Sequence, residues 1–148
     1  MKNIVVAVDG SDVSQGALDH AVALARQNNA ALTGVFVIDG GWPDYIGNDW
    51  QSSKGARQGF LDYIREEQEQ QAKAARGQFE RATNGLPATQ FELLAGDPTE
   101  VVVKLASEPS DDFLILNQRV FQVSGRPSLK SLGKLLAGVA RRPYLMFP

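Results

Sequence analysis

Residues 3–11, NIVVAVDGS, lie close to the start of the chain and give the first indication of its fold class. Its apolar part is rich in β-branched residues and stops at Asp9 and Gly10, which are turn residues. A short run of this kind is typical of a strand buried on both faces. Ser11 is a residue type that caps helices. The apolar residues that follow recur at a helical period, namely Ala17, Ala21, Leu24 and Ala25.

The rest of the chain repeats this alternation of strand and helix. Further strands are predicted over residues 31–38, 89–94, 113–116 and 144–147. Further helices are predicted over residues 60–82, 99–106 and 132–141. Residues 39–59 are rich in Gly, Pro, Asp, Asn and Ser and are predicted to form a long loop. The order predicts one α/β domain over residues 1–148, an open parallel five-stranded sheet with helices on both faces.

Composition narrows the classes of function. The chain has 148 residues and a formal net charge of -2, so nucleic acid is not expected as its partner. It has no cysteine, which excludes disulfides and thiolate chemistry and fits a reducing cytoplasm. The first apolar run is too short for a signal peptide or a membrane span. We therefore expect a cytoplasmic protein with no membrane partner.

Polar residues follow three of the predicted strands. Asp9, Asp39 and Asn117 each come where a strand ends. In an open parallel sheet, ligands bind outside the carboxyl ends of the strands, where the strand order reverses. These three residues are therefore the first candidates for a site.

Four signals in order resemble the universal stress protein family. They are IVVAVDGS at residues 4–11, LTGVFVID at 32–39, GDPTEVVVKLA at 96–106, and a last strand led by Pro143. The resemblance extends over essentially the whole chain. It implies a Rossmann-like fold of the adenine nucleotide alpha hydrolase type, a role in stress response and a homodimer.

The family resemblance also carries a pattern that this chain lacks. After their fourth strand, ATP-binding members have Gly, two residues, Gly, nine residues, Gly, and then Ser or Thr. Laid on residues 117–131, NQRVFQVSGRPSLKS, the pattern puts Asn117, Val120 and Lys130 at the three glycines and Ser131 at the hydroxyl residue. Backbone amides approach phosphate closely only where side chains are absent. Each lost charge-assisted bond costs about 1.5–3 kcal/mol, so ATP binding should weaken by orders of magnitude.

The sequence thus predicts a degenerate nucleotide site with no cofactor. Its residues would be Asp9, Gly10, Asn117, Arg119, Lys130 and Ser131. In the family, the acid matching Asp9 lines the nucleotide site, although a turn residue of this type also accepts backbone N–H groups. Ser131 could contact phosphate or cap the helix that follows it.

An alternative keeps an anion in this loop. Arg119, Arg126 and Lys130 make the loop basic, and such side chains could replace the lost amides at a helix N-terminus. ATP or AMP with Mg²⁺ would then bind. The competing interpretation is a solvated charged loop.

Two further features have open interpretations. Residues 39–59 contain Trp42, Tyr45 and Trp50, which could form a binding lid, a partner surface or a small satellite core. His20 is the only histidine, and no triad, carboxylate pair or metal spacing accompanies it.

An enzyme that activates its substrate by adenylation is disfavoured. Such enzymes need a phosphate-binding loop after the first strand, but residues 9–14, DGSDVS, are poor in glycine and contain Asp12, which would repel pyrophosphate.

The last predicted strand is apolar and lies near the chain end. Its residues are Tyr144, Leu145, Met146 and Phe147. An exposed apolar edge strand invites pairing with another chain, and family members often pair their last strands across a two-fold axis. A strand buried in the core without a dimer is the alternative. Together with the family resemblance, which alone implies the stress response, the sequence predicts a homodimeric regulatory or interaction module that is not an enzyme and does not bind ATP. It leaves room for a protein partner but does not identify one.

Overall fold

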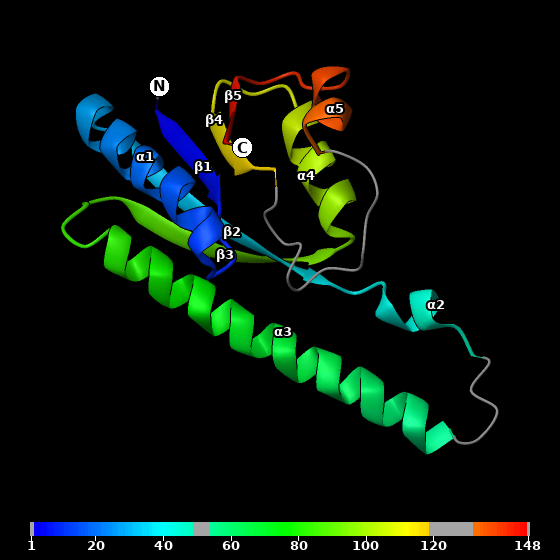
Figure 1. Cartoon of the computed structure of the whole chain (residues 1–148). Helices are drawn as coiled ribbons and strands as arrows, with labels where there is room; N and C mark the ends of the chain where they lie inside the picture. The colour runs from blue at the N-terminus through cyan, green and yellow to red at the C-terminus, as the bar shows by residue number, and fades with distance from the viewer. Residues whose placement is uncertain (1, 49–53, 119–131, 148) are drawn as a thin grey trace.

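The computed structural model describes residues 2–48, 54–118 and 132–147. The strands are β1 (Asn3–Ala7), β2 (Ala31–Asp39), β3 (Thr89–Gly96), β4 (Phe113–Asn117) and β5 (Tyr144–Phe147). The helices are α1 (Asp12–Asn28), α2 (Trp42–Ile46), α3 (Lys54–Ala82), α4 (Pro98–Ser107) and α5 (Leu132–Ala137). All the strand pairs are parallel, in the order β3-β2-β1-β4-β5 (Figure 1). The predicted parallel five-stranded α/β sheet is confirmed.

The helices cover both faces of the sheet. Helices α1 and α3 contact each other, and α4 and α5 contact each other. Figure 1 shows the first pair on one face and the second pair on the other. The chain therefore passes from one face to the other at the edge strand β3, and the strand order reverses between β1 and β4. This reversal is where a crevice is expected in an open parallel sheet.

The core lies along the two central strands. Residues 4–8 and 114–116 are buried, and the side chains of α1 that face the sheet are mainly alanine and leucine. Gly34 lets α3 approach β2 closely, because a Cβ there would lie 2.6 Å from the ring of Phe79. The small residue on the strand thus fixes where the helix packs.

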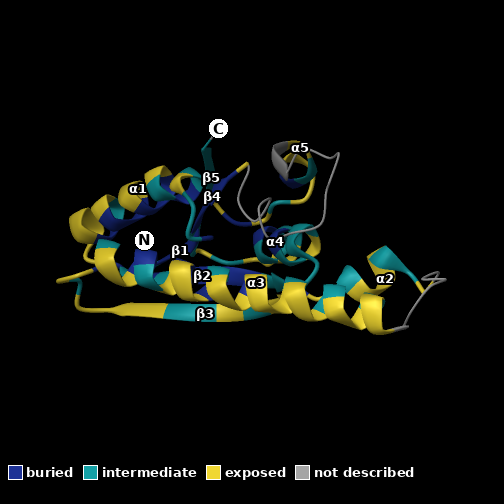
Figure 2. Ribbon diagram, turned by 60° about the horizontal axis from the view of Figure 1, so that its bottom comes forward, coloured by how far each residue is buried: buried dark blue, intermediate teal, exposed yellow. Residues whose placement is uncertain are grey.

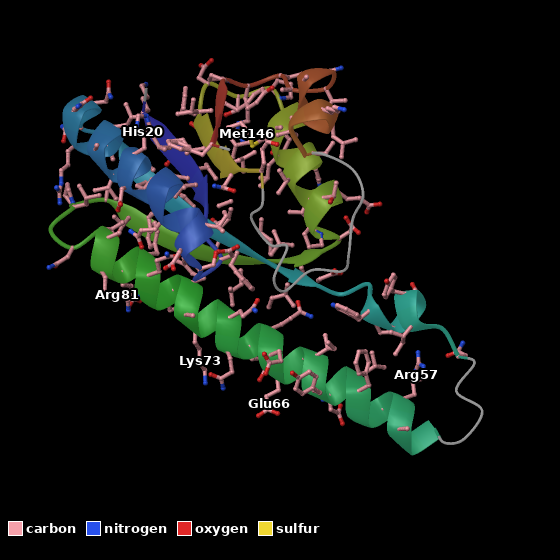
Figure 3. The ribbon with its side chains drawn as sticks, in the orientation of Figure 1. His20, Arg57, Glu66, Lys73, Arg81 and Met146 are labelled. Atoms are coloured by element: carbon pink, nitrogen blue, oxygen red, sulfur yellow. The ribbon has the colours of Figure 1, made fainter. Side chains whose placement is uncertain are left out.

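Helix α3 is longer than the sheet it covers. It has 29 residues, which at a rise of about 1.5 Å each is a rod of roughly 43 Å. Its first half runs past the sheet together with α2, and its outer side is exposed (Figure 2). The side chains of Glu66 and Lys73 point away from the sheet (Figure 3). No helix among the described residues is both long and apolar enough to cross a membrane.

The prediction of one long loop over residues 39–59 was wrong. Helix α2 lies within it, and α3 begins at Lys54 rather than at Phe60. Pro43 sits in the first turn of α2, where its missing N–H costs nothing. Arg57 of α3 ties α2 down by donating from Nε to the Gly47 carbonyl at 2.8 Å (Figure 3). Tertiary contacts therefore stabilise a helix that the local composition does not indicate.

The helix predicted over residues 132–141 is also shorter than expected. Helix α5 ends at Ala137, and the chain then turns through Gly138. The N–H of Arg141 donates to the carbonyl of Ala106, near the end of α4, at 2.8 Å. This bond directs the chain into β5 instead of letting the helix continue.

Candidate functional site

Two of the predicted site residues meet at the start of α1. Asp9 follows β1, and Asn117 is the last residue of β4. The Asp9 carboxylate accepts hydrogen bonds from the Ser11 N–H at 3.0 Å and from the Ser11 hydroxyl. The Asn117 side-chain Nδ2 donates to the Val13 carbonyl at 2.9 Å. The point where the strand order reverses is thus bridged by the chain's own side chains.

Ser11 is the N-cap residue of α1, as predicted, but its hydroxyl makes no capping bond with the helix. It donates to Asp9 instead. The Ser11 carbonyl accepts from the Ser14 hydroxyl at 3.1 Å, so the first turn of α1 is still held to its cap residue. The Ser11 hydroxyl therefore bonds to the Asp9 carboxylate instead of capping the helix.

Gly10 is required by close packing of the turn against α3. Its φ is +81°, a conformation that side chains disfavour. A Cβ at this position would lie 2.9 Å from the Ala74 Cβ and 3.0 Å from the Ala75 nitrogen. The Gly10 N–H donates to Oε1 of Gln78 at 3.1 Å. Gly10 thus lets α3 pack closely against the turn, and its N–H also bonds to that helix.

Gln78 is a buried residue that the sequence interpretation missed. Its Oε1 accepts from Gly10 and also from the Ser14 hydroxyl at 2.9 Å. Its Nε2 donates to the Ser11 carbonyl and to Gln15 Oε1, both at 3.0 Å. Every hydrogen-bonding atom of this amide is engaged, and so the turn after β1 is fixed to α3.

A second glutamine of α3 holds the end of β2. The Asp39 N–H donates to Gln68 Oε1 at 2.6 Å, and Gln68 Nε2 donates back to the Asp39 carbonyl at 3.0 Å. One Asp39 carboxylate oxygen accepts from the Gly41 N–H at 2.9 Å. Asp39 thus lies at the predicted edge, but its described contacts are with α3 and the following turn rather than with α1.

A sequence signal for both glutamines exists. The apolar stripe of α3 includes Ile64, Ala72 and Phe79, and Gln68 and Gln78 fall on the same stripe. A polar residue at a core position of a helix indicates a buried amide with partners. Apolar periodicity alone predicts the helix and does not single out these two amides.

Several predicted residues lie outside the part of the chain that the structure describes. Arg119, Lys130 and Ser131 of the predicted nucleotide site are among them, as are Val120 and Arg126. Their assignment therefore stays a prediction. Trp50 of the aromatic segment is also outside the described residues.

The predicted dimer strand is at the edge of the sheet. Strand β5 pairs with β4, with Leu145 opposite Ile115, and it is the last strand in the sheet order. Its four residues are half-buried. Phe147 packs edge-on against His20 of α1, with ring centroids 5.5 Å apart. The lone histidine thus packs on the edge strand, beside residues predicted to face a second copy.

A parallel sheet whose strand order reverses between β1 and β4, with helices on both faces, is that of the small Rossmann-like α/β proteins. Within that class, residues 1–142 match the model of the universal stress protein family. The chain belongs to this family. A Staphylococcus aureus (strain USA300) protein named as a universal stress protein is 31% identical over 140 residues, which cover 93% of this chain and 73% of that protein.

Solved structures agree with the fold. The universal stress protein UspA from Lactobacillus plantarum is similar, with a TM-score of 0.69, 25% identity and coverage of 99% of this chain and 97% of that chain. One universal stress protein solved in complex with cAMP has a TM-score of 0.61, 21% identity and coverage of 99% and 97%. Another, from Archaeoglobus fulgidus in complex with dAMP, has a TM-score of 0.61, 19% identity and coverage of 100% and 98%. At these identities the last two likenesses concern the fold alone.

Proposed function

We propose that this universal stress protein is a stress-response regulatory module that does not bind ATP where its strand order reverses. It acts on an unidentified protein partner and catalyses no reaction. We further propose a cytoplasmic location, on the ground of its cysteine-free composition. The observation that carries the proposal is the hydrogen bond between Asn117 and Val13.

The Asn117 side chain takes the place of a feature on which ATP binding depends. The family resemblance puts Asn117 where ATP-binding members have the first glycine. Asn117 is only 4% exposed, and its amide reaches across from β4 to the first turn of α1. A glycine has no side chain at this point, so backbone and phosphate can come together there. To clear this position, the protein would have to break this partly buried hydrogen bond and move the amide.

Asp9 and Gly10, which follow β1, are also engaged in hydrogen bonds within the chain. The Asp9 carboxylate accepts two hydrogen bonds from Ser11, and the Gly10 amide donates to Gln78. A nucleotide would compete with these internal bonds for the same groups. Such competition lowers affinity even where the fold is retained, because a buried donor or acceptor left without its partner costs about 1–3 kcal/mol.

The homodimer is part of this proposal. Strand β5 ends the sheet, and its half-buried residues Tyr144, Leu145, Met146 and Phe147 would pair with the same strand of a second copy. Light scattering should give the mass of a dimer at micromolar concentration. The Leu145→Asp variant should have a mass closer to that of a monomer. The Tyr63→Asp variant, changed on the outer side of α3, should remain a dimer. A wild-type monomer would rule out the dimer.

The test of ATP binding begins with the protein as it is purified from cells. Denaturing extraction followed by mass spectrometry should find no stoichiometric nucleotide. Thermal unfolding scans with ATP, AMP and Mg²⁺ should show no shift, since a ligand at 100 times its Kd would add about 2.7 kcal/mol of stability. The proposal would be wrong if the extract contained stoichiometric nucleotide. It would also be wrong if nucleotide raised the melting temperature saturably and Asp9→Ala abolished that rise.

A second candidate function is binding of a nucleotide in a different way. It is favoured by the two structures of the same fold that were solved with cAMP and with dAMP. In this case Arg119 and Lys130 would contact the phosphates in place of glycine amides, with ATP or AMP and Mg²⁺ as the ligand. A nucleotide affinity that falls at least tenfold in Arg119→Ala and in Lys130→Ala, and falls steeply with salt, would favour this candidate.

A further inference from the structure

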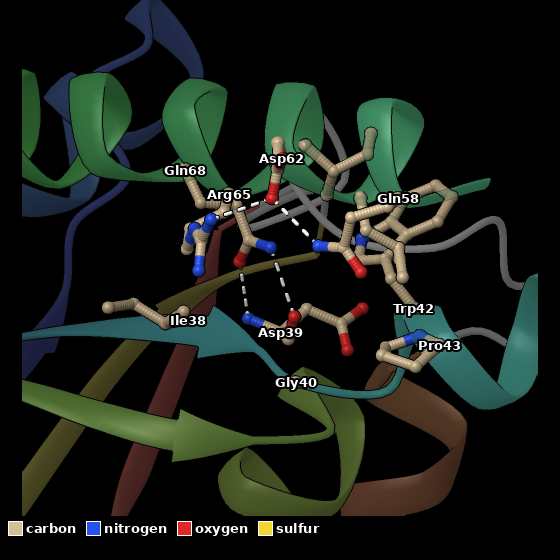
Figure 4. A pocket seen from close by; sticks show the side chains of 11 residues that line it. Ile38, Asp39, Gly40, Trp42, Pro43, Gln58, Asp62, Arg65 and Gln68 are labelled. Atoms are coloured by element: carbon tan, nitrogen blue, oxygen red, sulfur yellow. Dashed lines mark hydrogen bonds and ion pairs between the residues drawn. The ribbon is translucent and has the colours of Figure 1, made fainter. Parts of the chain in front are cut away.

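A cavity lies on the other side of β2 from the point where the strand order reverses. It is a half-open hollow of about 330 Å³, lined by the end of β2, by α2 and by the first half of α3 (Figure 4). Most of its wall is apolar, from Ile38, Trp42, Pro43, Leu61 and Ile64. Small-molecule sites are typically hollows of this type, mainly apolar with a few polar groups, with volumes from about 300 Å³ upward.

The volume sets the size of a ligand. A dry cavity of about 150 Å³ lined by apolar side chains takes up one benzene ring. A cavity of about 330 Å³ therefore has room for a molecule of two fused rings. Trp42 gives the wall an aromatic ring, which suits a planar aromatic molecule, because aromatic rings stack or meet edge to face.

One buried donor in the wall requires an acceptor. The indole Nε1 of Trp42 is shielded from solvent and has no hydrogen-bond partner among the described residues. A buried N–H without an acceptor is unfavourable, and such donors usually find one. The exposed carboxamide of Gln58 lies beside the indole in Figure 4, and its Nε2 donates to Asp62 at 2.9 Å. An acceptor entering the cavity would reach Nε1 once this exposed side chain turns aside.

The charges in the wall disfavour an anionic ligand. Asp39, Asp62 and Arg65 all line the cavity, so the wall has a net negative charge that would repel an anion. Each carboxylate already has a donor, Arg65 for Asp62 at 2.7 Å and the Gly41 N–H for Asp39 at 2.9 Å, so no cationic ligand is needed either. The remaining requirement is an uncharged acceptor atom on an apolar frame.

The wall that carries Trp42 is a small element between glycines. Helix α2 has no buried residue, and it is flanked by Gly40 and Gly41 on one side and by Gly47, with φ +68°, on the other. It is held to α3 by Arg57, which donates to the Gly47 and Pro43 carbonyls, and by an edge contact between the rings of Trp42 and Phe60, at 6.1 Å. Such an element can shift as a unit to admit a ligand through torsions at the glycines, with the exposed Arg57 contacts and the Phe60 contact adjusting to the shift.

We propose that this cavity binds a small, neutral, planar molecule of one or two rings whose acceptor atom takes the Trp42 indole N–H. The site is separate from the region around Asp9 and Asn117. It would give the protein a way to sense a heterocyclic compound without a nucleotide. The proposal stands whether or not a nucleotide binds elsewhere.

The test uses a pair of probes that differ in one atom. Quinoline has a ring nitrogen that accepts a hydrogen bond, and naphthalene has the same shape without an acceptor. The full-length ¹⁵N-labelled protein is titrated with each probe while the two indole N–H signals are followed, with the Trp42 signal identified by its loss in Trp42→Phe. Quinoline should move that signal saturably and bind about three- to tenfold more tightly than naphthalene, the usual effect of one net hydrogen bond.

Three variants separate the site from unspecific contact. Trp42→Phe keeps a ring for Tyr45 and Phe60 and should abolish the preference for quinoline. Ile64→Phe fills the cavity and should weaken both probes at least tenfold. Tyr63→Ala lies on the exposed outer side of α3 and should change neither. The proposal is overturned if quinoline leaves the Trp42 signal unmoved up to its solubility, if both probes bind equally to the wild type, or if Ile64→Phe binds as well as the wild type.

Discussion

The carboxyl ends of two neighbouring strands are each held by a glutamine from the same helix, but their packing differs. Gln78 meets the turn after β1, where a Cβ added to Gly10 would lie 2.9 Å from Ala74. Gln68 meets the end of β2, beside a cavity of about 330 Å³. The first region leaves no room for one more carbon atom, and the second has room for a small molecule.

The difference follows from the residues that surround each glutamine. Near Gln78 the helix presents Ala74 and Ala75, so its backbone comes close to the turn. Near Gln68 it presents Leu61 and Ile64, which hold β2 and α2 at a distance. One helix therefore fixes the turn that positions Asp9 and, half its length away, leaves a hollow. The close-packed end secures the fold, and the open end is free to take up a ligand.

The largest effect should come from Gly10→Ala. The added Cβ would meet Ala74 and Ala75 at about 3 Å and would be held at φ +81°. Strain and overpacking together should lower the free energy of unfolding by about 4 kcal/mol. The matched control is Gly16→Ala in α1, where no atom lies within 4 Å of the added carbon and stability should rise by up to about 1 kcal/mol. Denaturant unfolding measures both, and equal effects would contradict the comparison.

The next effect should come from Gln78→Leu. The leucine has a similar volume but removes the acceptor for Gly10 and Ser14 and the donor to the Ser11 carbonyl. We expect a loss of about 3 kcal/mol, because several partly buried groups lose their partner at once. A thermal scan should show a melting temperature lower by about 9 °C for a chain of this size. A loss below 1 kcal/mol would mean that water replaces the amide and that the turn is not held by it.

Gln68→Leu should cost less, about 2 kcal/mol. Here two bonds to the Asp39 backbone are lost, and the neighbouring cavity lets the structure adjust. Comparing this variant with Gln78→Leu in the same unfolding assay sharpens the contrast between the two ends of α3. If Gln68→Leu were the more harmful of the two, the open end would be the more rigid one, contrary to our account.

The smallest effect should come from Ile64→Phe, which adds volume beside the cavity. Space is available there, so the free energy of unfolding should change by less than about 1 kcal/mol in either direction. In a closely packed region the same enlargement typically costs 1–3 kcal/mol. A loss of that size, measured by urea unfolding, would show that the cavity closes in solution.

The sheet could be predicted from the sequence, since its signals are local. Runs such as residues 3–8 have the composition of buried strands, and turn residues mark their ends. Asp9 and Asn117 could be placed at one edge, because parallel strands share a direction. Helix α2 could not be predicted, because it depends on Arg57 and Phe60, which approach it from another helix.

The detailed contacts of the site could be predicted less well. Ser11 is a good capping residue by type, yet its hydroxyl donates to Asp9, and no local pattern distinguishes these two uses. Gln78 could have been recognised as buried from its position on the apolar stripe of α3. The partners of Gln78 could not have been predicted, because they lie more than 60 residues away in sequence and contact it only in the folded chain.

Internal hydrogen bonds occupy the point where the strand order reverses, and we propose that ATP does not bind there. Isothermal titration of the purified wild-type protein with ATP and Mg²⁺, alongside Asp9→Ala, measures this binding. We predict no saturable heat for either protein, which corresponds to a Kd weaker than about 1 mM. A micromolar Kd for the wild type that weakens at least tenfold in Asp9→Ala would contradict the claim.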